Sequence, residues 1–201
     1  RRRGTIMNTQ RSIATSFVVT VFLAAVVTAC NRGDERAVKG PNAPNGARHD
    51  TLSDLTLNED GLGQIQIGMN LDDAVGMGLL NENPTMNTQC DFVFPAVGAG
   101  IPDGVSVVIV KGKVARIDVD TGAVTTDEGA KIGDSEDRIK NLYGDEVQVE
   151  PHKYNPGWHY MTVLGDSASA GKAIVFETDG KKVTMYRAGR LPEVKWVEGC
   201  G

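Results

Sequence analysis

One local pattern occurs twice in the chain, about 65 residues apart, and it divides the sequence into two similar halves. In Ile67–Val75 and again in Ile132–Lys140, an apolar residue and a glycine lead to a polar residue that is followed by acids. Asn70 and Ser135 suit the N-cap of a helix, and acids in the first turn complement the helix dipole. Each half is therefore predicted to contain a helix that begins at this pattern.

Each predicted helix is followed by a predicted β-hairpin. The first helix is expected to continue through residues 76–80, and the second is expected to stop at Gly144. Alternating apolar and polar residues then indicate antiparallel strands, and Asp179-Gly180 favours a tight turn between two of them. The predicted hairpins pair Val105–Val110 with Val114–Val119, and Ala173–Thr178 with Lys181–Arg187.

An extra strand is expected before each hairpin, at about residues 89–94 and 158–164. The sequence thus predicts an α+β fold of two tandem repeats, each a helix followed by an antiparallel sheet of about three strands. The first repeat is assigned to residues 59–127 and the second to residues 128–201.

The N-terminal region has the layout of an export signal. An apolar run, Ile13–Ala29, follows Arg11 and ends in Val27-Thr28-Ala29 before Cys30. This layout resembles the signal peptide of bacterial lipoproteins, which implies cleavage before Cys30 and acylation of that cysteine. Residues 1–29 are accordingly predicted to be the signal, with the true start at Met7. An uncleaved anchor helix is the alternative, although the run is short of the roughly 20 strongly apolar residues that span a bilayer.

The residues after Cys30 are predicted to tether a folded body to a membrane. Asn31 is not the aspartate associated with inner-membrane retention, so the resemblance implies a lipid anchor in the bacterial outer membrane, facing the periplasm. Residues 30–58 are polar, rich in Gly, Pro and Asn, and show no apolar period. Such a segment cannot bury enough surface to order itself, which predicts a flexible linker.

The charge of the exported part opposes two classes of partner. All 26 acidic residues follow Cys30, whereas four of the 21 Lys and Arg residues precede it, which leaves a formal charge of −9. Nucleic-acid binding is driven by neutralisation of phosphates, and flat adsorption on anionic lipid also needs basic residues. We therefore expect no nucleic-acid partner, and contact with the membrane only through Cys30.

Cys90 and Cys200 are the two cysteines that remain. In an oxidising envelope, an even number of cysteines without lipid indicates a disulfide. A redox or metal-binding pair is the alternative, but the chain has no Cys-x-x-Cys motif. The bond is predicted to be structural and to join the first half of the fold to the end of the chain.

The repeated segments also resemble two families of small exported domains. Ile65-x-x-Gly68-Met69 before a capped helix is similar to the opening of β-lactamase-inhibitor-protein-like repeats and of small lipoproteins of the outer-membrane barrel assembly machinery. The chain departs from that pattern at Asn70, where Thr is usual, and the second copy lacks the Met. The resemblance implies a role in protein binding or assembly rather than catalysis.

Short catalytic and metal-binding signatures in the chain are incomplete. Gly133-Asp134-Ser135 and Gly165-Asp166-Ser167 match a tripeptide of some serine hydrolases, but neither lies in a Gly-x-Ser-x-Gly elbow. Asp118-Val119-Asp120-Thr121-Gly122 begins like a calcium loop, yet a glycine occupies a ligand position. The sequence therefore predicts no catalytic residue, no metal site and no cofactor.

The best candidate for a binding surface is a segment rich in aromatic residues. Every Trp and Tyr of the chain lies at or beyond Tyr143. Aromatic side chains with a polar group suit contact surfaces, and a Trp beside a turn can stack on a sugar ring. In the alternative interpretation, Trp158 and Tyr160 face the core of the second sheet. The candidate residues are His152, Tyr154, Trp158, His159 and Tyr160, with Lys153 beside them.

Two functions fit these observations. The first is a membrane-anchored envelope lipoprotein that binds another envelope protein without catalysis, as an assembly factor, scaffold or inhibitor. The alternative is a module that binds peptidoglycan or another glycan through the Tyr154–Tyr160 loop. An exposed Trp158–Tyr160 pair would favour the glycan, whereas burial of both with an apolar patch elsewhere would favour a protein partner.

Overall fold

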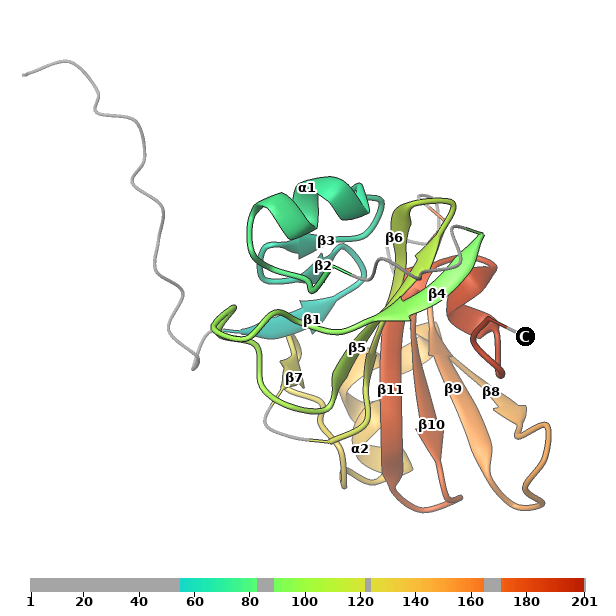
Figure 1. Cartoon of the computed structure of the whole chain (residues 1–201). Coiled ribbons are helices and arrows are strands. Elements are labelled where there is room, and N and C mark those ends of the chain that lie inside the picture. Colours follow the sequence, from blue (N-terminus) through green and yellow to red (C-terminus); the bar gives the residue numbers. More distant parts are fainter. Residues whose placement is uncertain (1–54, 83–88, 122–123, 165–170, 201) are drawn as a thin grey trace, which may run out of the picture. The chain divides into compact units, whose positions relative to one another are not determined.

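The computed structural model describes residues 55–82, 89–121, 124–164 and 171–200, which form two β-sheets and two short α-helices (Figure 1). The larger sheet is antiparallel, and its strands are, in spatial order, β4 (Cys90–Val93), β5 (Val105–Val110), β6 (Lys113–Val119), β11 (Val183–Arg190), β10 (Lys172–Thr178), β9 (His159–Val163) and β8 (Val147–Pro151). The smaller sheet is mixed and contains β3 (Ile65–Gln66), β2 (Gly61–Leu62), β1 (Thr56–Asn58) and β7 (Thr125–Thr126). The helices are α1 (Leu71–Gly76) and α2 (Glu136–Tyr143), with 3-10 turns η2 (Gly144–Glu146) and η4 (Glu193–Lys195).

Both predicted hairpins and both predicted extra strands are confirmed. β5 pairs with β6, and β10 pairs with β11, in each case antiparallel. The extra strand of the first half is β4, and that of the second half is β9. The sequence did not predict β8, which pairs with β9 at the end of the larger sheet.

The prediction of two tandem helix-plus-three-strand repeats is wrong, because the hairpins of both halves join in one continuous sheet. β6 of the first half pairs with β11 of the second, from Val119 opposite Tyr186 to Arg116 opposite Gly189. The regular structure of the described residues is therefore mostly β, with a seven-stranded and a four-stranded sheet. Pairing of β6 with β11 gives each of these strands a second hydrogen-bonded neighbour. In two separate sheets, both strands would be exposed edges.

The two predicted helix starts differ in how they are capped. The Ser135 hydroxyl accepts a hydrogen bond from the backbone N–H of Arg138 at 3.2 Å, as a capping residue should. Asn70 makes no such bond, and its side chain instead contacts Asp73 and Lys113. The first helix also ends at Gly76 and does not continue through residues 77–80 as expected, because Gly78 has a φ of +72° that an α-helix cannot contain.

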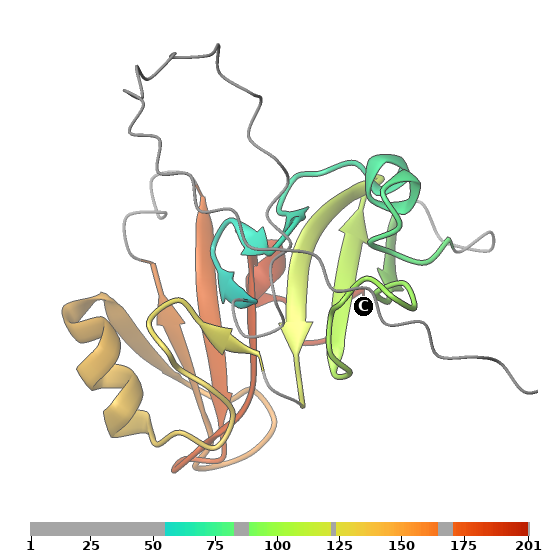
Figure 2. The same ribbon diagram turned by 90° about the vertical axis from the view of Figure 1, so that its left-hand side faces the viewer.

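The larger sheet buries both of its faces. Its inner face packs on the two helices and the small sheet, and Figure 2 shows α1 beside strands of the first half and α2 beside strands of the second. Its outer face is covered by residues 191–200, here called the C-terminal strap, through Val194, Val197 and Trp196. The fully buried core of the inner face includes Val107, Ile109, Ile117, Val119, Met161, Ile174, Phe176 and Tyr186 from the sheet, together with Leu57, Leu62, Ile65, Ala74 and Ile139.

The small sheet begins inside the range assigned to the linker. Thr56–Asn58, at the end of the predicted linker 30–58, form β1 and pair with β2 and, in parallel, with β7. Leu57 is fully buried there. The predicted signal peptide, Cys30 and residues 30–54 of the linker lie outside the described residues.

The predicted disulfide between Cys90 and Cys200 is confirmed. It joins β4 to the end of the C-terminal strap across 110 residues of sequence, with Cα atoms 5.5 Å apart. Disulfides of this kind persist in oxidising compartments, so the bond is characteristic of an extracytoplasmic protein.

Replacing both Cys90 and Cys200 by serine should lower the free energy of unfolding by about 4–5 kcal/mol, because the bond closes a loop of 110 residues in the unfolded chain. Urea unfolding of the double variant and of the wild type measures the difference. Wild-type protein held in a reductant should approach the stability of the double variant. A loss below about 1 kcal/mol would contradict a stabilising role for the bond.

Candidate functional site

The predicted aromatic segment forms the turn between β8 and β9, which lie at one end of the larger sheet. His152 follows β8, and its backbone N–H donates to the carbonyl of Trp158 at 3.0 Å. A second backbone bond, from Trp158 N–H to the Asn155 carbonyl, closes the turn. These bonds bring residues from the two ends of the segment together beside the C-terminal strap.

His152 is the centre of this turn and is not available as a surface group. Its side chain is 3% exposed, and its Nδ1 accepts from the backbone N–H groups of Tyr154 and Asn155 at 3.0 and 3.1 Å. Because Nδ1 accepts, Nε2 carries the proton and donates to a Glu177 carboxylate oxygen at 2.9 Å. The imidazole also stacks on the Tyr160 ring, with centroids 4.6 Å apart. The imidazole therefore holds the turn in its conformation and anchors it to β10.

The five candidate residues do not form one exposed surface. His152 and Tyr160 are buried on the outer face of the sheet, and Trp158 is partly buried against the His152 ring. Tyr154 remains 55% exposed, with the Lys153 ammonium 4.9 Å from its ring centroid. His159 lies apart from the other four, next to α2.

His159 belongs to a small polar cluster at the start of α2. Its Nδ1 lies 2.7 Å from a Glu136 carboxylate oxygen, which also accepts from the Thr178 hydroxyl at 2.5 Å. Burial raises the pKa of Glu136, but the hydrogen bonds from Thr178 and His159 outweigh it, so the pKa lies below its ordinary value of 4.5. The cluster joins α2 to strands β9 and β10.

Two buried arginines connect the outer face of the sheet to the C-terminal strap. Arg116 pairs with both carboxylate oxygens of Asp118, at 2.7 and 2.8 Å, and also donates to the carbonyls of Glu193 and Trp196. Burial raises the pKa of Asp118, and Arg116 opposes that shift. A planar guanidinium with several donors can serve a carboxylate and two carbonyls at once. The strap is thus held by charge-assisted hydrogen bonds as well as by the disulfide.

Arg187 makes the same kind of connection one strand away. Its Nε donates to the Val194 carbonyl at 2.7 Å, and its Nη1 lies 3.3 Å from a Glu177 oxygen. The side chain is 2% exposed, and its carbon Cζ lies 5.7 Å from the Tyr160 ring centroid. Burial lowers the pKa of Arg187, as does Arg116, while Asp118 and Glu177 oppose the shift.

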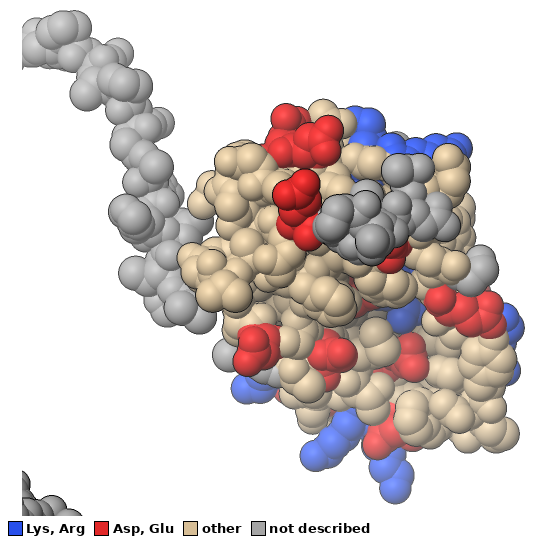
Figure 3. All heavy atoms as spheres, in the orientation of Figure 1, with Lys and Arg blue, Asp and Glu red and all other residues tan. Residues whose placement is uncertain are grey.

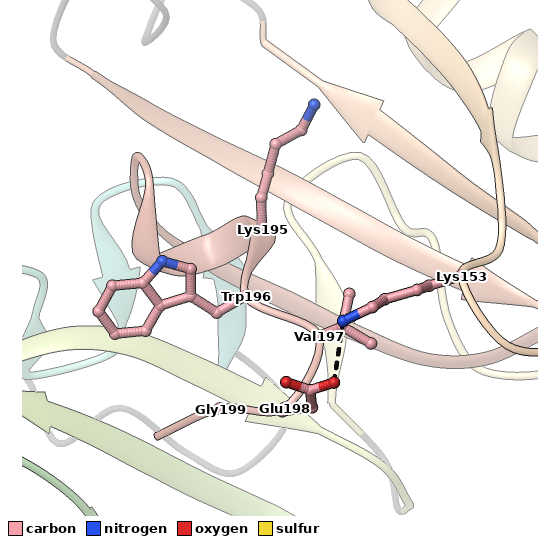
Figure 4. Close-up of a pocket in the computed structure, with 6 residues that line it drawn as sticks. All are labelled: Lys153, Lys195, Trp196, Val197, Glu198 and Gly199. Atoms are coloured by element: carbon pink, nitrogen blue, oxygen red, sulfur yellow. Dashed lines mark hydrogen bonds and ion pairs between the residues drawn. The ribbon is translucent and has the colours of Figure 1, made fainter. Parts of the chain in front are cut away.

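Two hollows lie against the strap. One has a volume of about 340 Å³ and is bordered by the Lys153–Glu198 ion pair and by Trp196 (Figure 4). The other, called here the strap cavity, has a volume of about 160 Å³ and lies between the strap and the outer face of β8, β9, β10 and β11. Lys195 and Val197 border both hollows.

Three large apolar side chains are exposed in the first half of the chain, on two segments that backbone hydrogen bonds hold side by side. Met77, Phe94 and Val97, called here the Phe94 patch, are 54%, 59% and 103% exposed. Phe94 and Val97 follow β4 directly, and Met77 follows α1. The run Phe94-Pro95-Ala96-Val97 lacks the alternation of a strand and the period of a helix, and that was the only signal in the sequence.

The described ranges, 55–82, 89–121, 124–164 and 171–200, bear on two other kinds of site. They contain no group of three or more His, Cys, Asp and Glu side chains arranged to hold a metal ion. Neither helix within them is long and apolar enough to cross a membrane.

Comparisons with known proteins concern the fold only. No protein-family model and no curated protein matches the chain. The structure is similar to the crystal structure of the uncharacterized protein yfeY from Escherichia coli, with a TM-score of 0.43 and 16% identity over 67% of this chain and 99% of that chain. It is also similar to an extracellular protein containing a SCP domain from Bacillus anthracis str. Ames, with a TM-score of 0.40 and 12% identity over 77% of this chain and 50% of that one. These comparisons assign no family.

Glu136→Gln should make the free energy of unfolding less dependent on pH in the acidic range. A carboxyl with a lowered pKa adds stability above its ordinary pKa of 4.5, and this stability is lost as the pH falls through the folded value. The variant should therefore lose about 1–2 kcal/mol at neutral pH, and the difference from wild type should shrink below pH 4.5. Urea unfolding across this range measures it.

Asp137→Asn is the matched control for Glu136→Gln, because Asp137 is the next acid of α2 and its side chain is 91% exposed. Its effect should stay within about 0.5 kcal/mol at every pH. A deficit of Glu136→Gln that is the same at low and neutral pH would contradict the role assigned to the charged carboxylate.

Proposed function

We propose that the chain is an outer-membrane-anchored envelope lipoprotein that binds another envelope protein and catalyses no reaction. The observation that carries this proposal is the Phe94 patch. Large apolar side chains exposed on neighbouring segments of a folded protein can mark an interaction surface, and aromatic residues dominate the energy of such surfaces.

The Phe94 patch is built on backbone that is already ordered. The N–H of Ala96 donates to the Leu79 carbonyl at 2.9 Å, and the N–H of Asn81 donates to the Phe94 carbonyl at 3.0 Å. A further bridge pairs Leu80 with Pro95. These bonds hold the segment after α1 beside the segment after β4, so a partner would not have to order them. Preorganisation of this kind lowers the cost of association.

The patch would contribute part of the energy of a specific contact. Each large apolar side chain that is taken from water to a protein interface contributes about 1.5–3 kcal/mol. In the view of Figure 3, the surface over the loop after β4 is mostly uncharged, and acidic side chains lie over α1. Asp72 and Asp73 are exposed acids of α1. A partner with an apolar centre and a basic rim would complement this arrangement.

The predicted lipid anchor would confine this surface to the membrane. Acylation of Cys30, followed by a flexible linker, would keep the folded body within a short distance of the bilayer and raise its effective concentration toward neighbouring envelope proteins. A stable anchor needs more than one acyl chain, as bacterial lipoproteins are expected to carry.

The alternative function, binding of a glycan through the Tyr154–Tyr160 loop, has weaker support. Stacking on a sugar needs an exposed ring face, and Tyr154 is the exposed ring of that loop. The Lys153 ammonium already lies over that ring. Tyr160 stacks on His152 and is 8% exposed.

A photo-crosslinking amino acid at position 97 should capture one envelope protein when the lipidated protein is irradiated in its native membranes. Adding Phe94→Asp should reduce that product about tenfold or more, because a charge replaces the proposed aromatic anchor. Gel analysis and mass spectrometry measure the product and identify the partner. Phe94 is 59% exposed, so the substitution should leave the melting temperature unchanged.

The same crosslinker at Lys181, an exposed residue of the β10–β11 turn, is the matched control. It should not give the product seen from position 97. Equal products from the two positions, or a product that persists with Phe94→Asp, would overturn the proposed binding surface.

A further inference from the structure

We propose that the strap cavity binds the carboxylate group of a small ligand or of a peptide end. This site is separate from the Phe94 patch and does not depend on the function proposed for it. The cavity is lined by Glu150, Tyr160, Thr162, Val175, Arg187, Lys195 and Val197.

Among the residues that line the strap cavity, Thr162 gives the strongest indication of a ligand. It is 0% exposed, and its hydroxyl oxygen has no hydrogen-bond partner among the described residues. A buried polar group without a partner is costly, and nearly all buried polar groups in native proteins are paired. Valine would fill the same volume without that cost. A hydroxyl at this point is therefore explained by a ligand that accepts a hydrogen bond from it.

Tyr160 also lines the cavity, and its hydroxyl is buried. The residue is 8% exposed, and its hydroxyl oxygen makes no hydrogen bond of normal geometry with the described residues. Burial raises its pKa, and so does Glu177, while the backbone N–H of Lys153 opposes the shift. The Lys153 N–H is a donor and can interact only with the hydroxyl oxygen. The O–H of Tyr160 is therefore still able to donate a hydrogen bond. Two hydroxyl donors in one small cavity select a group that accepts hydrogen bonds.

Two cationic side chains and one carboxylate line the cavity, and each cation is paired with a carboxylate. The Arg187 guanidinium is held in the wall by its bonds to Val194 and Glu177. Lys195 reaches the cavity from the strap and pairs with Glu150 at 2.8 Å. The Glu150 side chain is 52% exposed, so water can take the place of Lys195 around it. A ligand carboxylate could then pair with Lys195 while it accepts from the buried hydroxyls.

The volume of the strap cavity limits what enters it. About 160 Å³ corresponds to the share of roughly five water molecules in the liquid, and pockets that hold whole drug-sized ligands are about 300 Å³ or larger. The cavity therefore accommodates an end group. The neighbouring hollow of about 340 Å³ shares Lys195 and Val197 with it and can take the rest of a longer ligand, beside Trp196 (Figure 4).

Titration of the full chain in detergent micelles with sodium acetate, with Ala-Ala and with Ala-Ala-amide tests the proposal. NMR of isotope-labelled arginine and threonine side chains should show saturable shifts of Arg187 and Thr162 with acetate and with Ala-Ala, beyond those caused by sodium chloride of the same ionic strength. Tighter binding of Ala-Ala than of acetate would identify a peptide end, and the reverse order a small free carboxylate. Equal binding of Ala-Ala and its amide would overturn the proposal.

Thr162→Val should weaken acetate binding about tenfold or more, because it removes a hydrogen bond to a charged group. The same variant should raise the melting temperature of the ligand-free protein, because it removes a buried hydroxyl without a partner. Tyr160→Phe should act in the same direction on both measurements. Unchanged binding in both variants would overturn the proposal, as would the absence of saturable shifts.

Thr184→Val is the matched control for the loss of a threonine hydroxyl. The Thr184 hydroxyl donates to the Glu177 carbonyl at 3.1 Å, and the residue does not line the strap cavity. This variant should lower the melting temperature and leave acetate binding unchanged. A loss of binding equal to that of Thr162→Val would show that the effect is not specific to the cavity and would also overturn the proposal.

Discussion

The backbone pairing of β6 with β11 is the constraint on which the outer face depends. Arg116 and Asp118 belong to β6, and Arg187 belongs to β11. They reach the same strap only because the two strands are neighbours in one sheet. Gly189 makes the pairing close at this point, since a Cβ there would lie 2.5 Å from the Ala115 carbonyl oxygen. Because Gly189 has no side chain, β6 and β11 can pair closely, and Arg116 and Arg187 can both donate hydrogen bonds to the C-terminal strap.

The C-terminal strap shows how an irregular segment can cover a sheet. Its regular structure is limited to the short turn η4, and buried carbonyls need hydrogen bonds. Arg116 and Arg187 supply them at three strap residues, Glu193, Val194 and Trp196. The arginines in turn need anions, because a buried guanidinium without a partner is strongly destabilising. Asp118 and Glu177 meet that need from within the sheet.

The features that the sequence predicted correctly depend on residues that are close together in the sequence, or on the number of cysteines. The Ser135 cap and the turn at Asp179-Gly180 involve residues a few positions apart, and the disulfide required only two cysteines in an exported chain. The joining of the halves depends on residues about 70 positions apart, and strands of two or three residues, such as β1, are too short to show a period. The burial of His152 was missed for the same reason, because it depends on Glu177 from a strand that comes later in the chain.

The strand β4 links the two surfaces proposed here to bind other molecules. Its end leads directly into Phe94, and its first residue, Cys90, is bonded to the last cysteine of the strap. Between them, the ring of Phe92 lies so close to Gly199 that a Cβ at position 199 would be 2.5 Å from it. One covalent bond and one tight packing contact therefore fix both the support of the Phe94 patch and the end of the strap. A rigid common support would lower the ordering cost of binding at either proposed surface.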